Sequence, residues 1–237
     1  MTHSPARSFW RGFVGALPFL TVIGPFGLLF GVVATEAGLD LFETVAMTVA
    51  VIAGASQFTA LALLSDQAPA FIALLTALAV NLRLALYSAS ITPHLGLLPF
   101  WQRALVAYVL VDQTYGLSLN EYERRPGMPA ASKLAYFLGS ASGCVPAWLG
   151  FAIFGALAGE AIPKEYALDF AVPITFIALF APMLRSAPHL VAAFVSILAA
   201  LALASLPWSL GSIAAALLAM MAGAETERRL AGRRESP

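Results

Sequence analysis

Polar side chains that could bind a solute stand inside long apolar stretches of this sequence. Ser56 and Gln57 follow Gly54 in one stretch, and Asn81 and Arg83 lie in the next. Amide and charged groups at membrane depth are expensive, and they usually face a cavity or another polar group. The pattern therefore predicts a membrane protein with a polar interior, which favours transport.

Gln57 has neighbours that suit the recognition of an amino acid. Its side-chain amide both donates and accepts hydrogen bonds, and the small residues Gly54 and Ser56 let other backbones approach closely. These groups match the ammonium and carboxylate of a free amino acid. The alternative is that Gln57 links two helices by a hydrogen bond and touches no substrate.

Two opposite charges are expected inside the membrane. The guanidinium of Arg83 stays charged and offers a planar fork of donors to a carboxylate. One interpretation pairs Arg83 with a substrate carboxylate. The other pairs it with Asp112 in the following apolar stretch, either as a structural ion pair or as part of a transport cycle in which Asp112 carries a proton.

The first apolar stretch is interrupted by helix-breaking residues. Proline removes a backbone donor and clashes with the preceding turn, and Pro18, Pro25 and Gly27 all lie in this stretch. Backbone groups freed in a membrane must be satisfied by neighbours, water or a ligand. The pattern predicts either a broken helix that binds a polar substrate near Pro25 and Gly27, or a kink that aids packing.

Composition excludes several other classes of function. The net charge is zero, which argues against nucleic-acid binding. Cys144 is the single cysteine, and the sequence contains neither a metal-ligand spacing, a Gly-x-Ser-x-Gly elbow nor a phosphate loop. We therefore expect no catalytic residues, no metal and no cofactor, so that the protein is not an enzyme.

Hydrophobicity predicts an all-α, polytopic membrane bundle of about eight spans with interrupted helices. Of the 237 residues, 60% are hydrophobic and 11% charged, and the mean hydropathy is +0.83. A bilayer-spanning helix needs ~20 apolar residues, and this rule gives one transmembrane domain over residues 1–237 with a polar tail at 224–237. No cleavage site precedes the first span, so we expect it to be retained. The predicted spans are 12–35, 43–64, 68–91, 101–119, 133–159, 167–185, 187–205 and 207–223.

The distribution of lysine and arginine predicts the orientation. Short cytoplasmic loops carry an excess of these residues, and eight spans place both termini on the side that holds most of them. The opposite side would hold only Arg103 and Lys164 among the basic residues. Both termini are therefore expected in the cytoplasm.

A faint internal repeat accompanies these spans. Pro18, Phe26-Gly27 and Gly31 recur at a constant offset as Pro146, Phe154-Gly155 and Gly159. Transporters are often built from such repeats, and the halves here would be 12–119 and 133–223. The same matches can also arise by chance in an apolar chain.

The motifs together resemble the AzlC family of branched-chain amino acid permeases. The resemblance covers roughly residues 10–120, and the second half of the chain is similar to the family only in length and hydropathy. The matching segments are Pro25-Phe26-Gly27-Leu28-Leu29-Phe30-Gly31, Glu36-Ala37-Gly38-Leu39, Ala53-Gly54-Ala55-Ser56-Gln57-Phe58, Asn81-Leu82-Arg83, Tyr87-Ser88-Ala89-Ser90 and Asp112.

The resemblance implies a gradient-driven exporter of branched-chain amino acids in the inner membrane, working with a small membrane subunit of the AzlD type. Two residues depart from the family pattern: Leu84 stands where the family usually has histidine, and Gln113 where it usually has glutamate. These departures put proton coupling in doubt and leave Asp112 as the titratable candidate. The alternative function is a passive channel or a structural membrane subunit, whose polar residues serve only assembly.

Overall fold

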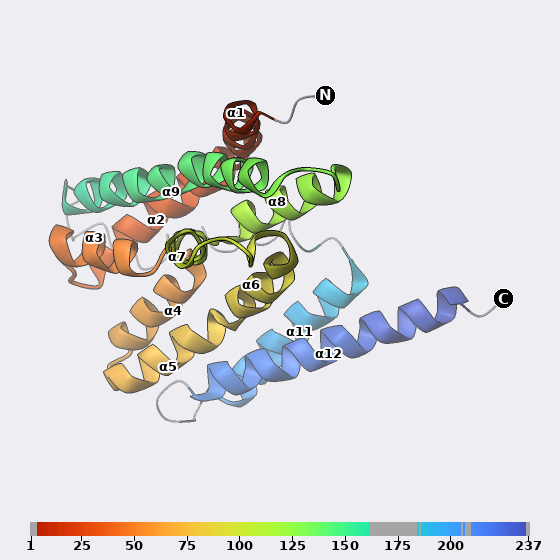
Figure 1. The fold of residues 1–237 in the computed structure, drawn as a ribbon. Coiled ribbons are helices and arrows are strands. Elements are labelled where there is room, and N and C mark those ends of the chain that lie inside the picture. Colours follow the sequence, from red (N-terminus) through yellow and green to blue (C-terminus); the bar gives the residue numbers. More distant parts are fainter. Residues whose placement is uncertain (1–3, 162–183, 185, 205, 207–209, 236–237) are drawn as a thin grey trace. The chain divides into compact units, whose positions relative to one another are not determined.

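The computed structural model describes residues 4–161, 184, 186–204, 206 and 210–235. These residues are helical or form turns between helices, and the described part of the chain contains no β-strand (Figure 1). The predicted fold class, an all-α membrane bundle with interrupted helices, is confirmed. The chain separates into two compact units, one of Met1–Leu61 with Ala77–Tyr166 and the other of Ala62–Thr76 with Ala167–Pro237.

Among the described residues, three helical stretches are long and apolar enough to cross a membrane: Pro5–Glu36, Ala70–Leu95 and Ala130–Gly159. The first and third contain the predicted spans 12–35 and 133–159, and the second overlaps the predicted span 68–91 from residue 70 onward. The predicted span 167–185 lies outside the described residues apart from Leu184. The helices are α1 (Pro5–Ala16), the 3-10 turn η1 (Leu17–Phe19), α2 (Leu20–Glu36), α3 (Leu41–Ala50), α4 (Gly54–Ser65), α5 (Ala70–Val80), α6 (Leu82–Leu95), α7 (Phe100–Tyr108), α8 (Asp112–Arg124), α9 (Ala130–Ala161), α11 (Ala187–Ala202) and α12 (Leu210–Glu235).

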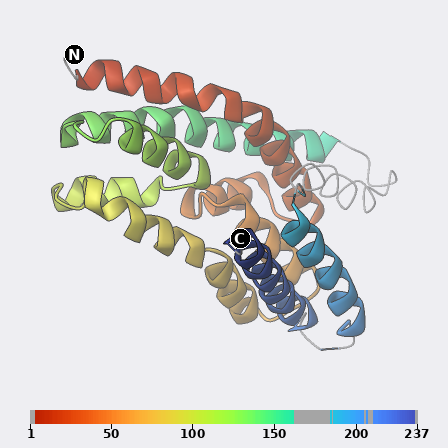
Figure 2. The same cartoon turned by 90° about the vertical axis from the view of Figure 1, so that its right-hand side faces the viewer.

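In the first unit, α1 and α2 pack in parallel against α9 along their whole length (Figure 2). A Cβ atom on Gly12 would lie 2.1 Å from the Tyr136 carbonyl oxygen, and one on Gly31 would lie 2.1 Å from that of Ala152. Glycine at both positions therefore lets the two backbones touch. The two runs that carry the predicted repeat thus lie side by side, although the repeat halves 12–119 and 133–223 stay a prediction.

The interruption expected near Pro25 is absent, and this is a correction to the sequence analysis. Helix α2 runs through Pro25, which is exposed. Pro18 lies in η1, the short 3-10 turn between α1 and α2. Proline is tolerated inside membrane helices because neighbouring groups can satisfy the freed backbone. Gly27 agrees with the predicted alternative in which this segment serves helix packing. A Cβ there would meet Phe151 and the Trp148 carbonyl oxygen of α9 at 3.0 and 3.3 Å.

The interruptions occur instead in the second and fourth predicted spans. Residues 51–53 separate α3 from α4, and residues 109–111 separate α7 from α8. Val51 and Val111 both have extended backbone conformations. Each of these two spans is therefore a pair of short helices rather than one continuous crossing helix.

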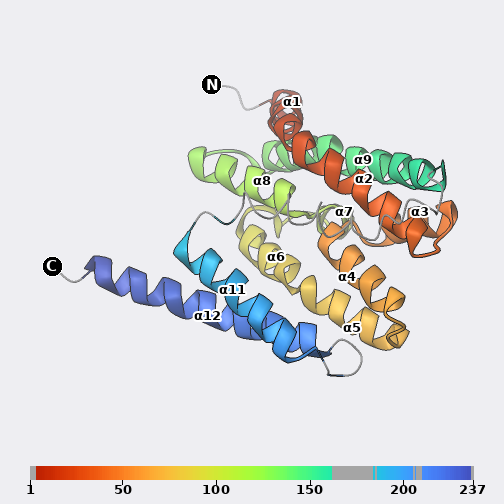
Figure 3. The ribbon, with the colours of Figure 1, turned by 180° about the vertical axis from the view of Figure 1, so that it is seen from behind.

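The second unit contains the antiparallel pair α11 and α12 (Figure 3). A Cβ on Gly223 would meet Ala192 at 3.2 Å, so a small residue there permits close packing. Helix α12 continues as far as Glu235, beyond the predicted span 207–223. Most of the polar tail is thus a helical extension, in which Glu225 forms ion pairs with Arg228 and Arg229.

Candidate functional site

The two helix interruptions of the first unit lie against each other. The hydroxyl of Tyr108, the last residue of α7, donates a 2.6 Å hydrogen bond to the carbonyl oxygen of Val49 in the last turn of α3. Ile52 of the first interruption packs against the apolar cluster that contains Val109 and Leu110 of the second. Two segments of non-helical backbone, distant in sequence, therefore meet at one place.

Hydroxyl side chains satisfy the backbone at both interruptions. Thr114 Oγ1 accepts a 2.9 Å hydrogen bond from the Val111 amide, and it lies 3.0 and 3.1 Å from the carbonyl oxygens of Val111 and Val109. Ser56 occupies the same place in α4, where its hydroxyl donates to the Ala53 carbonyl at 2.9 Å. Both side chains are buried. Non-helical backbone in a membrane requires such partners.

Arg83 and Asp112 meet beside the second interruption. Arg83 Nη2 lies 3.2 Å from Asp112 Oδ2, and the two side chains are 37% and 42% exposed. Asp112 is the first residue of α8, so its carboxylate also lies near the positive end of the helix dipole. The contact is present as the sequence analysis anticipated, while a role in substrate binding or coupling stays a prediction.

Several polar atoms around this ion pair are enclosed but unpaired. Arg83 Nε, Asp112 Oδ1 and the Asn81 side-chain oxygen are each shielded from solvent and lack a hydrogen-bond partner in the structure. Asn81 lies at the junction of α5 and α6, and the Tyr87 ring stacks on Tyr115 with centroids 4.2 Å apart. The ion pair therefore retains hydrogen-bonding capacity for another group.

Gln57 lies in the first turn of α4 and is 1% exposed. Its Nε2 donates to Thr48 Oγ1 of α3 across the interruption, at 3.4 Å. Its Oε1 and the Thr44 hydroxyl, also buried, have no hydrogen-bond partner. The predicted alternative, in which Gln57 links two helices by a hydrogen bond, thus agrees with the structure. The Oε1 of the same amide remains free to accept a hydrogen bond.

Aromatic rings enclose the start of α4. The Phe26 and Phe58 ring centroids are 4.9 Å apart, and those of Phe30 and Trp148 are 5.9 Å apart. A Cβ on Gly54 would lie 2.7 Å from Trp148 Cη2, so a larger residue there would require the Trp148 ring to shift. The buried indole Nε1 of Trp148 is also unpaired. The region is apolar with a few hydrogen-bonding groups, which is the usual composition of a small-molecule site.

The residues predicted for a single site form two groups. Gly54, Ser56 and Gln57 begin α4. Asn81 directly precedes α6, and Arg83 of α6 meets Asp112 at the start of α8. Gly27 is buried against α9. That both groups line one cavity stays a prediction. Within the described residues, no cluster of three His, Cys, Asp or Glu side chains could hold a metal ion.

Five residues that the structure places in this region are not singled out by the sequence: Thr44, Thr48, Tyr108, Thr114 and Trp148. Thr44 and Thr48 recur at a spacing of four residues and lie four and eight residues after the Asp40 capping box that begins α3. That spacing is a helix-face signal which could have placed both hydroxyls together. Tyr108 and Trp148 carry no comparable local signal, because aromatic residues are common in membrane helices.

Interrupted helices with polar groups at the breaks are typical of helical membrane transport proteins. The comparisons agree with this class: the model of the family described as AzlC protein matches residues 18–162. An "Uncharacterized membrane protein" of Archaeoglobus fulgidus is 31% identical over 77% of this chain and 80% of its own length. The "Inner membrane protein YgaZ" of Escherichia coli is 27% identical over 95% of this chain and 98% of its own length.

The chain belongs to the AzlC family. An "Uncharacterized membrane protein" of Helicobacter pylori is a further relative, 28% identical over 75% of this chain and 76% of its own length. No solved structure matches the chain. The family is one of membrane transport rather than of enzymes, and the relatives support a membrane location and a transporter-like role.

Proposed function

We propose that this protein is a secondary transporter that exports branched-chain or similar small apolar amino acids across the inner membrane. The observation that carries the proposal is the meeting of two helix interruptions, with enclosed and unpaired polar groups beside them. Discontinuous helices expose backbone groups that bind polar parts of a substrate at the membrane midplane. A purely structural subunit would have no need for unpaired groups of this kind.

The carboxylate, the ammonium group and the side chain of a small amino acid would each have a partner here. The first-turn N–H groups of α4 and of α8 favour a carboxylate, and the Gln57 Oε1 can accept from an ammonium group. The rings of Phe26, Phe58 and Trp148 offer an apolar surface to an aliphatic side chain. This combination supports a small amino acid with an apolar side chain.

Energy coupling and the partner subunit follow from the family resemblance. Asp112 lies beside the second interruption and pairs with Arg83. In the proposed coupling, a proton bound by the Asp112 carboxylate replaces the ion pair with Arg83. We expect an AzlD-like small membrane subunit to be required for transport. The competing function is a passive channel, in which the Arg83–Asp112 pair serves assembly alone.

Counterflow of labelled leucine in proteoliposomes tests the proposal, with and without the small subunit. Replacing Gln57 by leucine removes the free acceptor, and loss of one hydrogen bond of about 1.4 kcal/mol would weaken apparent leucine affinity about tenfold. Thr59→Ala is the matched control, because Thr59 lies on the same helix and bonds its own backbone at Ala55.

Three outcomes discriminate between the functions. Saturable counterflow that needs both subunits and is weakened by Gln57→Leu supports the transporter. Leucine flux that rises linearly with concentration and drives no counterflow supports the passive channel. Flux no greater than in protein-free liposomes, with the complex intact, would refute amino acid transport.

A further inference from the structure

Both ends of the α7–α8 segment lie at the same end of the first unit. His94, which precedes α7, has its Nδ1 3.1 Å from Lys133 Nζ, and Lys133 follows α8. The Tyr122 ring of α8 lies 5.0 Å from the His94 ring, and its hydroxyl donates a 2.8 Å hydrogen bond to the Lys133 carbonyl. The chain therefore enters α7 and leaves α8 close to one point.

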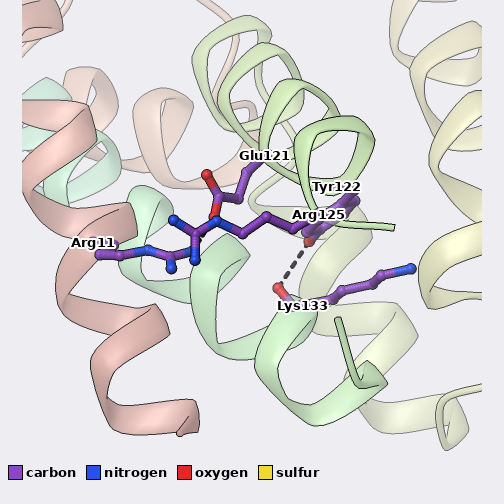
Figure 4. A network of polar contacts seen from close by, with 5 residues as sticks. All are labelled: Arg11, Glu121, Tyr122, Arg125 and Lys133. Atoms are coloured by element: carbon purple, nitrogen blue, oxygen red, sulfur yellow. Dashed lines mark hydrogen bonds and ion pairs between the residues drawn. The ribbon is translucent and has the colours of Figure 1, made fainter. Parts of the chain in front are cut away.

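This end of the unit is also where the first long helix begins. Arg11 of α1 forms an ion pair with Glu121 in the last turns of α8, and Arg125 Nε lies 3.0 Å from the same carboxylate oxygen (Figure 4). The close view shows the guanidinium groups of Arg11 and Arg125 side by side next to the Glu121 carboxylate, with Tyr122 bonded to Lys133 near them. The starts of α1 and α9 and the C-terminus of α8 thus share one face.

These contacts exclude a straight crossing by this segment. Residues 100–124 as one continuous helix would separate their ends by about 37 Å, at a rise of ~1.5 Å per residue. Helix α7 has nine residues, so it reaches about 13 Å into a core that is ~30 Å thick. The chain must then turn back, and the interruption at 109–111 is where it does so.

We propose that α7–α8 is a re-entrant hairpin that enters and leaves the membrane at the face bearing the start of α1. Its tip is residues 109–111, and Asp112 is the first residue after the tip. The tip backbone is satisfied by Thr114, and Val109 and Leu110 of the tip pack against Ile52 of the α3–α4 interruption. Tyr108, just before the tip, donates a hydrogen bond to the Val49 carbonyl at the end of α3. Non-helical backbone at membrane depth is tolerated only when it is buried in protein in this way.

The distribution of charge supports the hairpin and gives its direction. A crossing segment would put Arg103 on the opposite side from Arg11, Arg125 and Lys133. The hairpin puts all four on one face, and it leaves Glu36 at the far end of the first long helix. Because basic residues concentrate on the cytoplasmic side, the hairpin enters from the cytoplasm. The proposal depends on the membrane location of the chain and is independent of the solute transported.

Cysteine accessibility in sealed membrane vesicles tests the hairpin. Cys144 is buried and is replaced by alanine, and single cysteines are placed at exposed positions. Arg103→Cys and Glu123→Cys report the two ends of the hairpin. Arg7→Cys and Glu36→Cys report the two ends of the first long helix, and each variant is treated with a membrane-impermeant maleimide in right-side-out and in inverted vesicles.

We expect positions 7, 103 and 123 to be labelled in inverted vesicles and position 36 in right-side-out vesicles. Labelling of position 103 together with position 36, and opposite to 123, would overturn the hairpin. Gln102→Cys gives the same reading if the Arg103 variant does not reach the membrane. Independently, His94→Cys with Lys133→Cys should be joined by a short bismaleimide within one folded chain, and absence of the cross-link when both thiols react singly would also overturn the proposal.

Discussion

Replacing Gly155 by alanine should separate the two long parallel helices of the first unit. A Cβ at this position of α9 would lie 2.1 Å from the Leu28 carbonyl oxygen of α2, a distance that real Cβ contacts do not show. The obstacle is backbone, so no change of rotamer can relieve it. The contact must open to at least 3.0 Å, which requires one helix to move away from the other.

The cost follows from the packing that this movement disturbs. Overpacking a well-packed interface costs about 1–3 kcal/mol, sometimes more, and a gap of 0.5–1 Å forfeits roughly a quarter to a half of each dispersion contact. Because α2 and α9 touch along their length, we expect Gly155→Ala to lower the free energy of unfolding by about 3 kcal/mol. Alanine has a better helix propensity by roughly 1 kcal/mol, which offsets part of this cost.

Gly150 provides the matched control on the same helix. It is exposed, and a Cβ there would meet no other atom within 4 Å. Gly150→Ala should therefore leave the stability unchanged or raise it by up to about 1 kcal/mol through helix propensity. The free energy of unfolding of both variants would be measured in mixed micelles with increasing denaturing detergent, followed by circular dichroism and by a fluorescent probe.

The comparison has a clear refuting result. If Gly155→Ala and Gly150→Ala unfold at the same detergent fraction, the backbone contact between α2 and α9 does not hold the helices as described. If both variants lose stability to the same extent, any methyl group added to α9 is destabilising, and the effect of Gly155→Ala cannot be attributed to the contact with Leu28.

Two further tests concern the region around the interruptions, and a third concerns the ion pairs at the end of α8. In a double-mutant cycle, Arg83→Ala and Asp112→Ala should show a coupling energy of about 0.5–3 kcal/mol. This coupling energy is below that of a fully buried pair because both side chains are partly exposed. Strictly additive effects of the two single variants would exclude direct pairing. Tyr108→Phe removes the hydrogen bond to Val49 and should lower stability by about 1 kcal/mol in thermal unfolding, and an unchanged midpoint would mean that the bond does not form. Glu121→Gln removes the charge that faces two arginines and should make unfolding less sensitive to salt, because screening acts on charge pairs; an unaltered salt dependence would contradict the ion-pair network.

The sequence alone was sufficient for the membrane class, the family and the residues of opposite charge. Apolar stretches of spanning length reveal membrane helices because lipid must cover them, whatever the rest of the fold does. Arg83 and Asp112 were anticipated as a pair because two charges in apolar stretches of neighbouring spans have few other partners. The resemblance at Gly54, Ser56 and Gln57 agrees with the family match.

Only the tertiary structure decided where the helices break and which segments cross. One interruption lies at residues 109–111, which are apolar and include no glycine or proline that would predict a break. Pro25, which does predict one, lies within the continuous helix α2. Hydropathy records how apolar a segment is, and it does not record whether the helix within it is continuous. The partners that satisfy a break, such as Thr114 and the Tyr108–Val49 hydrogen bond, come from packing between segments distant in sequence. The contact of His94 with Lys133 likewise places both ends of α7–α8 on one face, because it joins residues 39 positions apart that a span count assigns to opposite sides.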